Sequence, residues 1–109
     1  MAYVDSALAL AATHENVYLE LSAIFASHRN GTLKYAGGDA VVERARRFAS
    51  RTMWGADANH GEPHQNDIGR NLEHLERALV DSGYNNTEAC SVLGGTARRV
   101  FAGIVGDGV

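Results

Sequence analysis

The chain has 109 residues, of which 45% are hydrophobic and 21% are charged, and its formal net charge is −3. This composition is typical of a soluble globular domain, and we expect a cytoplasmic protein. No stretch approaches the roughly 18 apolar residues of a membrane span, and the first residues lack the layout of a secretory signal peptide. The arginines are dispersed rather than clustered with aromatic residues, which argues against nucleic-acid binding. The only cysteine, Cys90, cannot form an internal disulfide, and the helical pattern around it predicts a small buried hydrophobe.

The first part of the chain predicts a helix, a strand and a loop. Apolar residues at helical spacing predict a helix over residues 3–13. Between residues 16 and 22 apolar and polar side chains alternate, which is typical of a strand. Residues 23–38 are rich in glycine and polar side chains and therefore indicate a loop.

A helix and a second strand follow this loop. We expect Asp39 to cap the helix, because Asp favours the position before the first helical turn. The apolar stripe of this helix is formed by Val41, Val42, Ala45, Phe48 and Ala49. Three arginines lie largely off that stripe and are expected to form a solvated face, namely Arg44, Arg46 and Arg47. The second strand is predicted over residues 51–56, and parallel pairing with the first would form a right-handed β-α-β crossover.

A polar loop and a long helix come next. Pro63 prevents a strand or a helix from continuing through residues 58–64. A long amphipathic helix is then expected from Asn66 or Asp67 to Gly83, which is a good left-handed C-cap. The loop before this helix has the position of a catalytic loop.

Two shorter helices are expected at the end of the chain. Asn85, with Glu88 three residues later, predicts a capping box at the start of a short helix through Leu93. We expect the pair Gly94-Gly95 to break that helix and Thr96 to cap the last one. The residues expected to face inward from the last helix are Val100, Phe101 and Ile104.

Three segments resemble the motifs of one enzyme family. Residues 16–22, NVYLELS, are similar to a strand written NVY-x-x-(L)-S, and residues 51–57, RTMWGAD, are similar to a strand written R-(V)-x-(F/W)-G-S-D. Residues 93–101, LGGTARRVF, are similar to a closing helix written (L)-G-G-N-A-R-R-(L)-F. These motifs belong to the amidohydrolase-related family of metal-dependent hydrolases and decarboxylases, and the resemblance covers almost the whole chain. The sequence departs from the family pattern at Ala56, Asn59 and Thr96.

The resemblance implies an α/β fold that forms about the last quarter of a (β/α)8 TIM-type barrel, with two parallel strands and flanking helices. A complete barrel needs about 250 residues. We therefore interpret residues 1–109 as a single partial domain whose missing part lies before residue 1. Two strands cannot close a barrel, and their inward faces would be partly uncovered at Val17, Leu19, Leu21, Met53 and Trp54. We expect self-association or a partner chain that supplies the rest of the barrel.

The candidate site follows the ends of the two strands. In the family an Asp at the end of the eighth strand belongs to the metal cluster, and the resemblance gives this role, as metal ligand or general base, to Asp57. A divalent metal is implied, with Zn²⁺ as the expected ion. His60 and His64 could add imidazole ligands, although this spacing in a loop interrupted by proline is more often formed by exposed polar residues. Ser22 and His64 are also candidates for substrate contact. The other histidines, His14, His28 and His74, match no ligand of the family and are expected to be exposed.

The implied activity is metal-assisted hydrolysis of an amide or ester, or decarboxylation of a small carboxylic acid, on a small-molecule substrate. One carboxylate with at most two loop histidines lacks the surrounding shell of a tight site, so we expect the isolated chain to bind divalent metal weakly. The alternative is a non-catalytic assembly or binding module, or an inactive truncated product that persists only with a partner.

Overall fold

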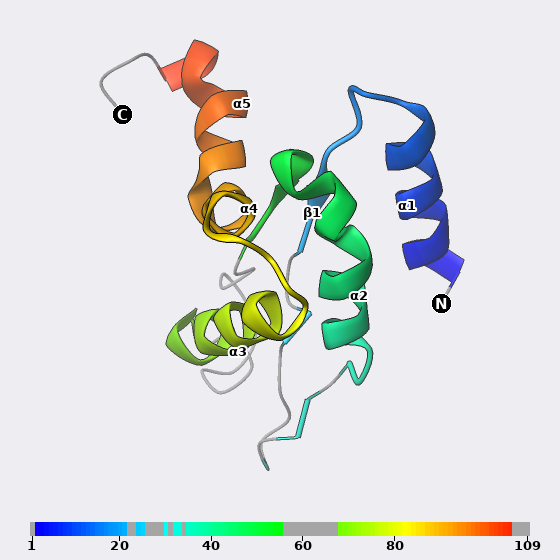
Figure 1. The fold of residues 1–109 in the computed structure, drawn as a ribbon, viewed down its shortest axis with the longest axis vertical. Helices are drawn as coiled ribbons and strands as arrows, with labels where there is room; N and C mark the ends of the chain where they lie inside the picture. Colours follow the sequence, from blue (N-terminus) through cyan, green and yellow to red (C-terminus); the bar gives the residue numbers. More distant parts are fainter. Residues whose placement is uncertain are drawn as a thin grey trace.

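The computed structural model describes residues 2–21, 24–25, 30, 32–33, 35–55 and 68–105. Helices account for most of these residues, and Figure 1 shows α2 and its continuation η1 between α1 and the C-terminal helices. None of the helices in these ranges is both long enough and apolar enough to cross a membrane. The elements are α1 (Ala2–Thr13), β1 (Leu19–Glu20), α2 (Gly38–Ala45), the 3-10 helix η1 (Arg46–Arg51), β2 (Thr52–Met53), α3 (Ile68–Asp81), α4 (Asn86–Cys90), the π-helical turn η2 (Ser91–Gly95) and α5 (Thr96–Val105).

The two predicted strands exist and pair in parallel among mostly helical residues, which is compatible with the α/β class. Leu19 is opposite Thr52 and Glu20 is opposite Met53. Each strand is only two residues long, which is shorter than predicted. The second strand begins late because η1 continues through Arg51. Beyond β2, the Trp54 N–H donates to the Val92 carbonyl at 3.1 Å, so the chain there bonds to η2.

Of the five residues expected to be partly uncovered, Val17, Leu19, Met53 and Trp54 are partly exposed, as predicted, whereas Leu21 is buried. Leu21 is 3% exposed and belongs to the hydrophobic core, and Trp54 packs against that core. Thr52 on β2 is fully buried, and its hydroxyl donates to the Phe48 carbonyl at 2.7 Å. Tyr18, just before β1, is 47% exposed. The alternation of side chains in β1 thus turns the apolar residues toward the helices and leaves aromatic surface on the other face.

The core lies between α2–η1 and α3 and confirms the predicted apolar stripe of α2. Every residue of that stripe is buried, and all of it except Ala45 and Phe48 belongs to one contiguous cluster. From α3 the cluster takes Leu75, Ala78 and Leu79, at the spacing of one helix face. The cluster is completed by Leu21, Phe25, Tyr84 and Val92, so the core joins this helix pair to the sheet and to the C-terminal helices.

Gly83 ends α3 as predicted. Its φ is +83°, a conformation that glycine adopts without steric cost. The Gly83 N–H donates to the Val80 carbonyl and the Tyr84 N–H donates to the Leu79 carbonyl, both at 3.0 Å, which is the Schellman pattern. Tyr84 and Leu79 both lie in the core cluster, and the Tyr84 hydroxyl donates to the Val42 carbonyl at 2.6 Å. The helix end thus fixes α3 to α2.

The start of α2 differs from the prediction. Gly37, not Asp39, is the N-cap, no side chain caps the helix, and Asp39 lies in the first turn. Gly38 is buried so closely that an added Cβ would lie 2.9 Å from the Ile24 carbonyl oxygen. Only glycine fits this close to Ile24, and α2 begins at this glycine, one residue before Asp39.

The C-terminal helices begin at the predicted capping box but are not interrupted at the predicted glycine pair. Asn85 and Glu88 form the capping box, with the Asn85 side chain accepting from the Glu88 N–H at 2.8 Å. Gly94-Gly95 does not end the helix, because α4, η2 and α5 run on with helical dihedrals through Thr96. Thr96 is therefore not a cap. It is fully buried, and its hydroxyl donates to the Ala49 carbonyl at 3.3 Å.

Three further residues are more exposed than predicted. Cys90 is exposed rather than buried. Val100 and Phe101 do not face inward, and 36% and 45% of their surfaces are accessible. Val100 lies four residues after the buried Thr96 and therefore on the same face of the helix, so α5 is covered at Thr96 but no longer at Val100.

We predict that Tyr84 makes folding sensitive to alkaline pH. Burial raises its pKa to about 12 in the folded chain, and the charge of Glu88 adds to this. The ordinary pKa is about 10. Between these values the unfolded chain releases the proton and the folded chain keeps it, so stability is complete below pH 10 and falls by about 1.4 kcal/mol per pH unit above it.

Tyr84→Phe should cost about 1 kcal/mol at neutral pH. It should also remove this part of the alkaline decline in urea-unfolding experiments. Tyr18→Phe, at an exposed position, is the matched control. An identical pH dependence in the wild-type and Tyr84→Phe chains would refute the assignment.

We also predict that the purified chain self-associates or is poorly soluble. Its sheet within the described residues has two strands, and Leu10, Tyr18 and Phe101 are 52%, 47% and 45% exposed. Strand edges and exposed apolar side chains both favour association. Light scattering is the test. A monodisperse monomer that melts cooperatively at tens of micromolar would contradict the prediction.

Candidate functional site

The site residues predicted from the sequence, Ser22, Asp57, His60 and His64, all lie outside the described residues. The nearest described residues before them are Leu21 and Gly55, which follow the two parallel strands. Parallel strands direct their carboxyl ends to the same edge of a sheet. The Leu21 N–H donates to the Met53 carbonyl at 2.9 Å at that edge. The two segments that lead to the candidate residues therefore begin side by side.

The described histidines do not form a metal centre. Within the described ranges, no three side chains of His, Cys, Asp or Glu are grouped closely enough to hold a metal ion. His14 is exposed, as predicted, and its Nδ1 lies 2.8 Å from the Thr13 hydroxyl. His74 is half-buried rather than exposed, because its ring stacks on Phe25 with 5.5 Å between centroids. His28 lies outside the described residues.

Arg51, the first residue of the second motif, is the most extensively bonded side chain near the sheet. Its guanidinium donates to the carbonyl oxygens of Ala11, His14 and Val17 at 2.9, 2.8 and 2.9 Å. These oxygens belong to the last turn of α1 and to the segment that leads into β1. The carbonyl end of a helix carries partial negative charge, so a cation there is favourable without a carboxylate partner. Arg51 thus connects α1 and the approach to β1 with the start of β2.

The third motif is bonded to the residues just before β2. The Arg99 guanidinium donates to the Ser50 carbonyl at 2.8 Å and to the Thr96 hydroxyl at 3.2 Å. The Thr96 hydroxyl in turn donates to the Ala49 carbonyl. Sequence reasoning missed both this connection and that of Arg51. The sequence does hint at these roles, because Arg51 and Arg99 are next to short apolar segments and have no acidic residue nearby in the sequence to pair with.

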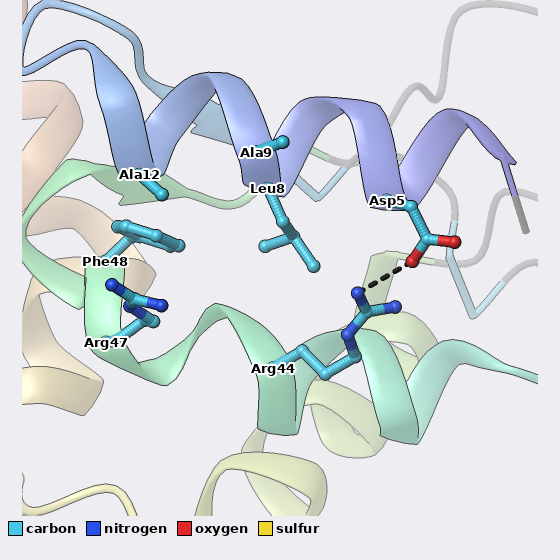
Figure 2. A pocket seen from close by; sticks show the side chains of 7 residues that line it. All are labelled: Asp5, Leu8, Ala9, Ala12, Arg44, Arg47 and Phe48. Carbon is cyan, nitrogen blue, oxygen red and sulfur yellow. Dashed lines mark ion pairs between the residues drawn. The ribbon is translucent and has the colours of Figure 1, made fainter.

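A groove with charged and apolar walls lies between α1 and α2–η1, and we call it the α1–α2 groove (Figure 2). Its volume is about 380 Å³. Asp5 on α1 accepts from Arg44 on α2 at 2.7 Å. The hydrogen bond and the charge of Arg44 lower the pKa of the Asp5 carboxyl, so this acid is ionised over the physiological range. The groove is further lined by Leu8, Ala9, Ala12, Arg47 and Phe48.

The three arginines predicted to form a solvated face are exposed, but each has a specific neighbour. Arg44 pairs with Asp5, and Arg46 pairs with Glu88 at 3.3 Å. The Arg47 guanidinium carbon lies 4.8 Å from the centroid of the Phe48 ring. The pKa of Glu88 is lowered by the hydrogen bond from the Asn85 N–H and further by Arg46. These contacts order the arginines along one side of α2–η1.

No protein-family model, curated protein or solved structure matches the chain.

We predict that removing the Arg51 guanidinium destabilises the fold. Arg51→Ala should lower the free energy of unfolding by about 2–3 kcal/mol, because three carbonyl groups lose a charged donor. Arg51→Lys should restore only part of the loss, since an ammonium lacks the planar fork of the guanidinium. Urea unfolding measures both. Arg77→Ala, on the exposed face of α3, is the matched control and should change stability by less than about 0.5 kcal/mol. Equal effects of the two alanine variants would refute this role.

Proposed function

We propose that this chain is the C-terminal portion of an amidohydrolase-related barrel enzyme that uses a divalent metal to hydrolyse an amide or ester, or to decarboxylate a small carboxylic acid. In this proposal β1 and β2 are the seventh and eighth strands. The other strands, and the histidine ligands that they carry in the family, come from sequence outside these 109 residues. The substrate is a small molecule.

One observation carries the proposal, namely that the three segments resembling the family motifs meet in space. Arg51 of the second segment bonds to the Val17 carbonyl of the first, within 2.9 Å. Arg99 of the third bonds to the Ser50 carbonyl, immediately before the second. Motifs of one structural unit are expected to lie together, and these contacts agree with that expectation.

The parallel pairing of the strands supports a catalytic role for the residues that follow them. In barrels of this type, catalytic side chains come from the carboxyl ends of the strands. Asp57 is four residues after Met53, and Ser22 is two residues after Glu20. An Asp in this position can bind the metal or take a proton from metal-bound water, which makes hydroxide available at neutral pH. Zn²⁺ accepts such a carboxylate together with imidazoles, and His60 is the nearest imidazole along the chain.

A chimera tests the proposal. The corresponding C-terminal segment of an amidohydrolase-related enzyme is replaced by residues 1–109, so that the host supplies the remaining strands and histidines. We expect a folded, zinc-loaded chimera with measurable hydrolase or decarboxylase activity. Asp57→Asn should lower kcat on the order of 10²–10⁴-fold, the usual contribution of a general base.

Asp81→Asn is the matched control, because Asp81 is an exposed carboxylate at the end of α3. It should leave kcat unchanged. Two outcomes would contradict the proposal, namely a folded and metal-loaded chimera without activity, or an active chimera in which Asp57→Asn behaves like Asp81→Asn.

A further inference from the structure

The α1–α2 groove is open to solvent and has the volume of a small-ligand site. Its volume of about 380 Å³ lies within the roughly 300–1,000 Å³ of such sites. Leu8, Ala9 and Ala12 form the wall on α1, while Arg44 and Arg47 line the opposite wall (Figure 2). The small alanine side chains leave space between the helices, and the leucine makes part of that space apolar.

The charges of the groove favour an anion. Two guanidinium groups line it against one carboxylate, that of Asp5, which is already bound to Arg44. Among the described residues Arg47 has no ion-pair partner and is held by the Phe48 ring alone. Arg51 adds positive charge, since its guanidinium carbon lies 5.3 Å from the same ring and its hydrogen bonds go to uncharged carbonyls. An arginine that rests on an aromatic ring keeps its N–H donors at the ring's edge available for a carboxylate.

We propose that the α1–α2 groove binds a small organic carboxylate, of the aryl or branched-chain class, with its carboxylate on Arg47 and its apolar body against Leu8, Ala9 and Ala12. The site is built by two helices and not by the residues that follow β1 and β2. It therefore goes beyond the proposed catalytic function and does not depend on it.

Ligand-observed NMR titration of the full chain with benzoate tests the site and works whatever the oligomeric state. We expect saturable binding with a dissociation constant on the order of 1 mM, as befits a ligand of this size. Benzyl alcohol, which keeps the ring and lacks the charge, should not bind measurably. Inorganic phosphate, which has the charge and lacks the ring, should bind more weakly and displace benzoate only at higher concentration.

Two variants with matched controls assign the binding to the groove. Arg47→Gln should weaken benzoate binding about tenfold, whereas Arg77→Gln on α3 should not change it. Ala9→Asp places a carboxylate in the groove and should abolish binding, whereas Ala102→Asp, at an exposed position on α5, should not. All four side chains replaced here are exposed, so circular dichroism should show an unchanged fold.

The proposal is overturned if benzoate binding does not saturate, or if Arg77→Gln weakens it as much as Arg47→Gln. Equal affinity for benzyl alcohol would exclude an anion site. Equal affinity for inorganic phosphate would exclude a role for the apolar wall.

Discussion

The contact between the Arg51 guanidinium and three backbone carbonyls determines how the N-terminal helix sits on the rest of the molecule. These carbonyls come from Ala11, His14 and Val17, and the guanidinium belongs to the last residue of η1. The Ala11 carbonyl lies in the last turn of α1, where oxygens lack intrahelical partners, and the Val17 carbonyl lies in the segment that leads into β1. One planar side chain with several donors satisfies them together and thereby sets the approach to β1. The α1–α2 groove exists because α1 is held at its C-terminal end by Arg51 and nearer its start by the pair of Arg44 with Asp5.

The 3-10 helix η1 imposes a similar requirement on the C-terminal helix. Its carbonyls at Phe48, Ala49 and Ser50 accept from side chains rather than only from the next turn. Two of the donors, Thr96 and Arg99, are on α5. Helix breaking at the preceding glycines would withdraw both donors, so continuation through the π-helical turn is favoured by the tertiary contacts and not by local propensity. Polar side chains that complete backbone hydrogen bonds thus fix the positions of the outer helices, while the apolar residues of α2 and α3 supply the core.

Features governed by local geometry could be predicted from the sequence, and features governed by distant contacts could not. The apolar stripe of α2 and the left-handed Gly83 depend on residues within one or two turns, and both were predicted correctly. The path of the chain through Gly94 depends on carbonyls some 45 residues away in η1, which no local pattern encodes. The outward orientation of Phe101 follows from that path. For the site, the residues proposed from the family resemblance, Asp57 and His60 among them, lie outside the described residues and stay predictions. The structural role of Arg51, in contrast, is visible only when α1 and β2 are seen together.

The four arginines between residues 44 and 51 show how one residue type can serve different purposes along a single helical segment. Arg44 and Arg46 form ion pairs with Asp5 and Glu88, respectively. Arg51 donates its hydrogen bonds to backbone carbonyls. Each of these contacts joins α2–η1 to another part of the described chain, so each is explained by the fold alone. Arg47 differs, because the ring that supports it, Phe48, is its immediate neighbour in sequence and the contact joins no distant elements. An exposed guanidinium that is oriented by a buried ring and faces an apolar wall contributes little to folding. Its N–H donors are the ones that the proposed carboxylate would bind.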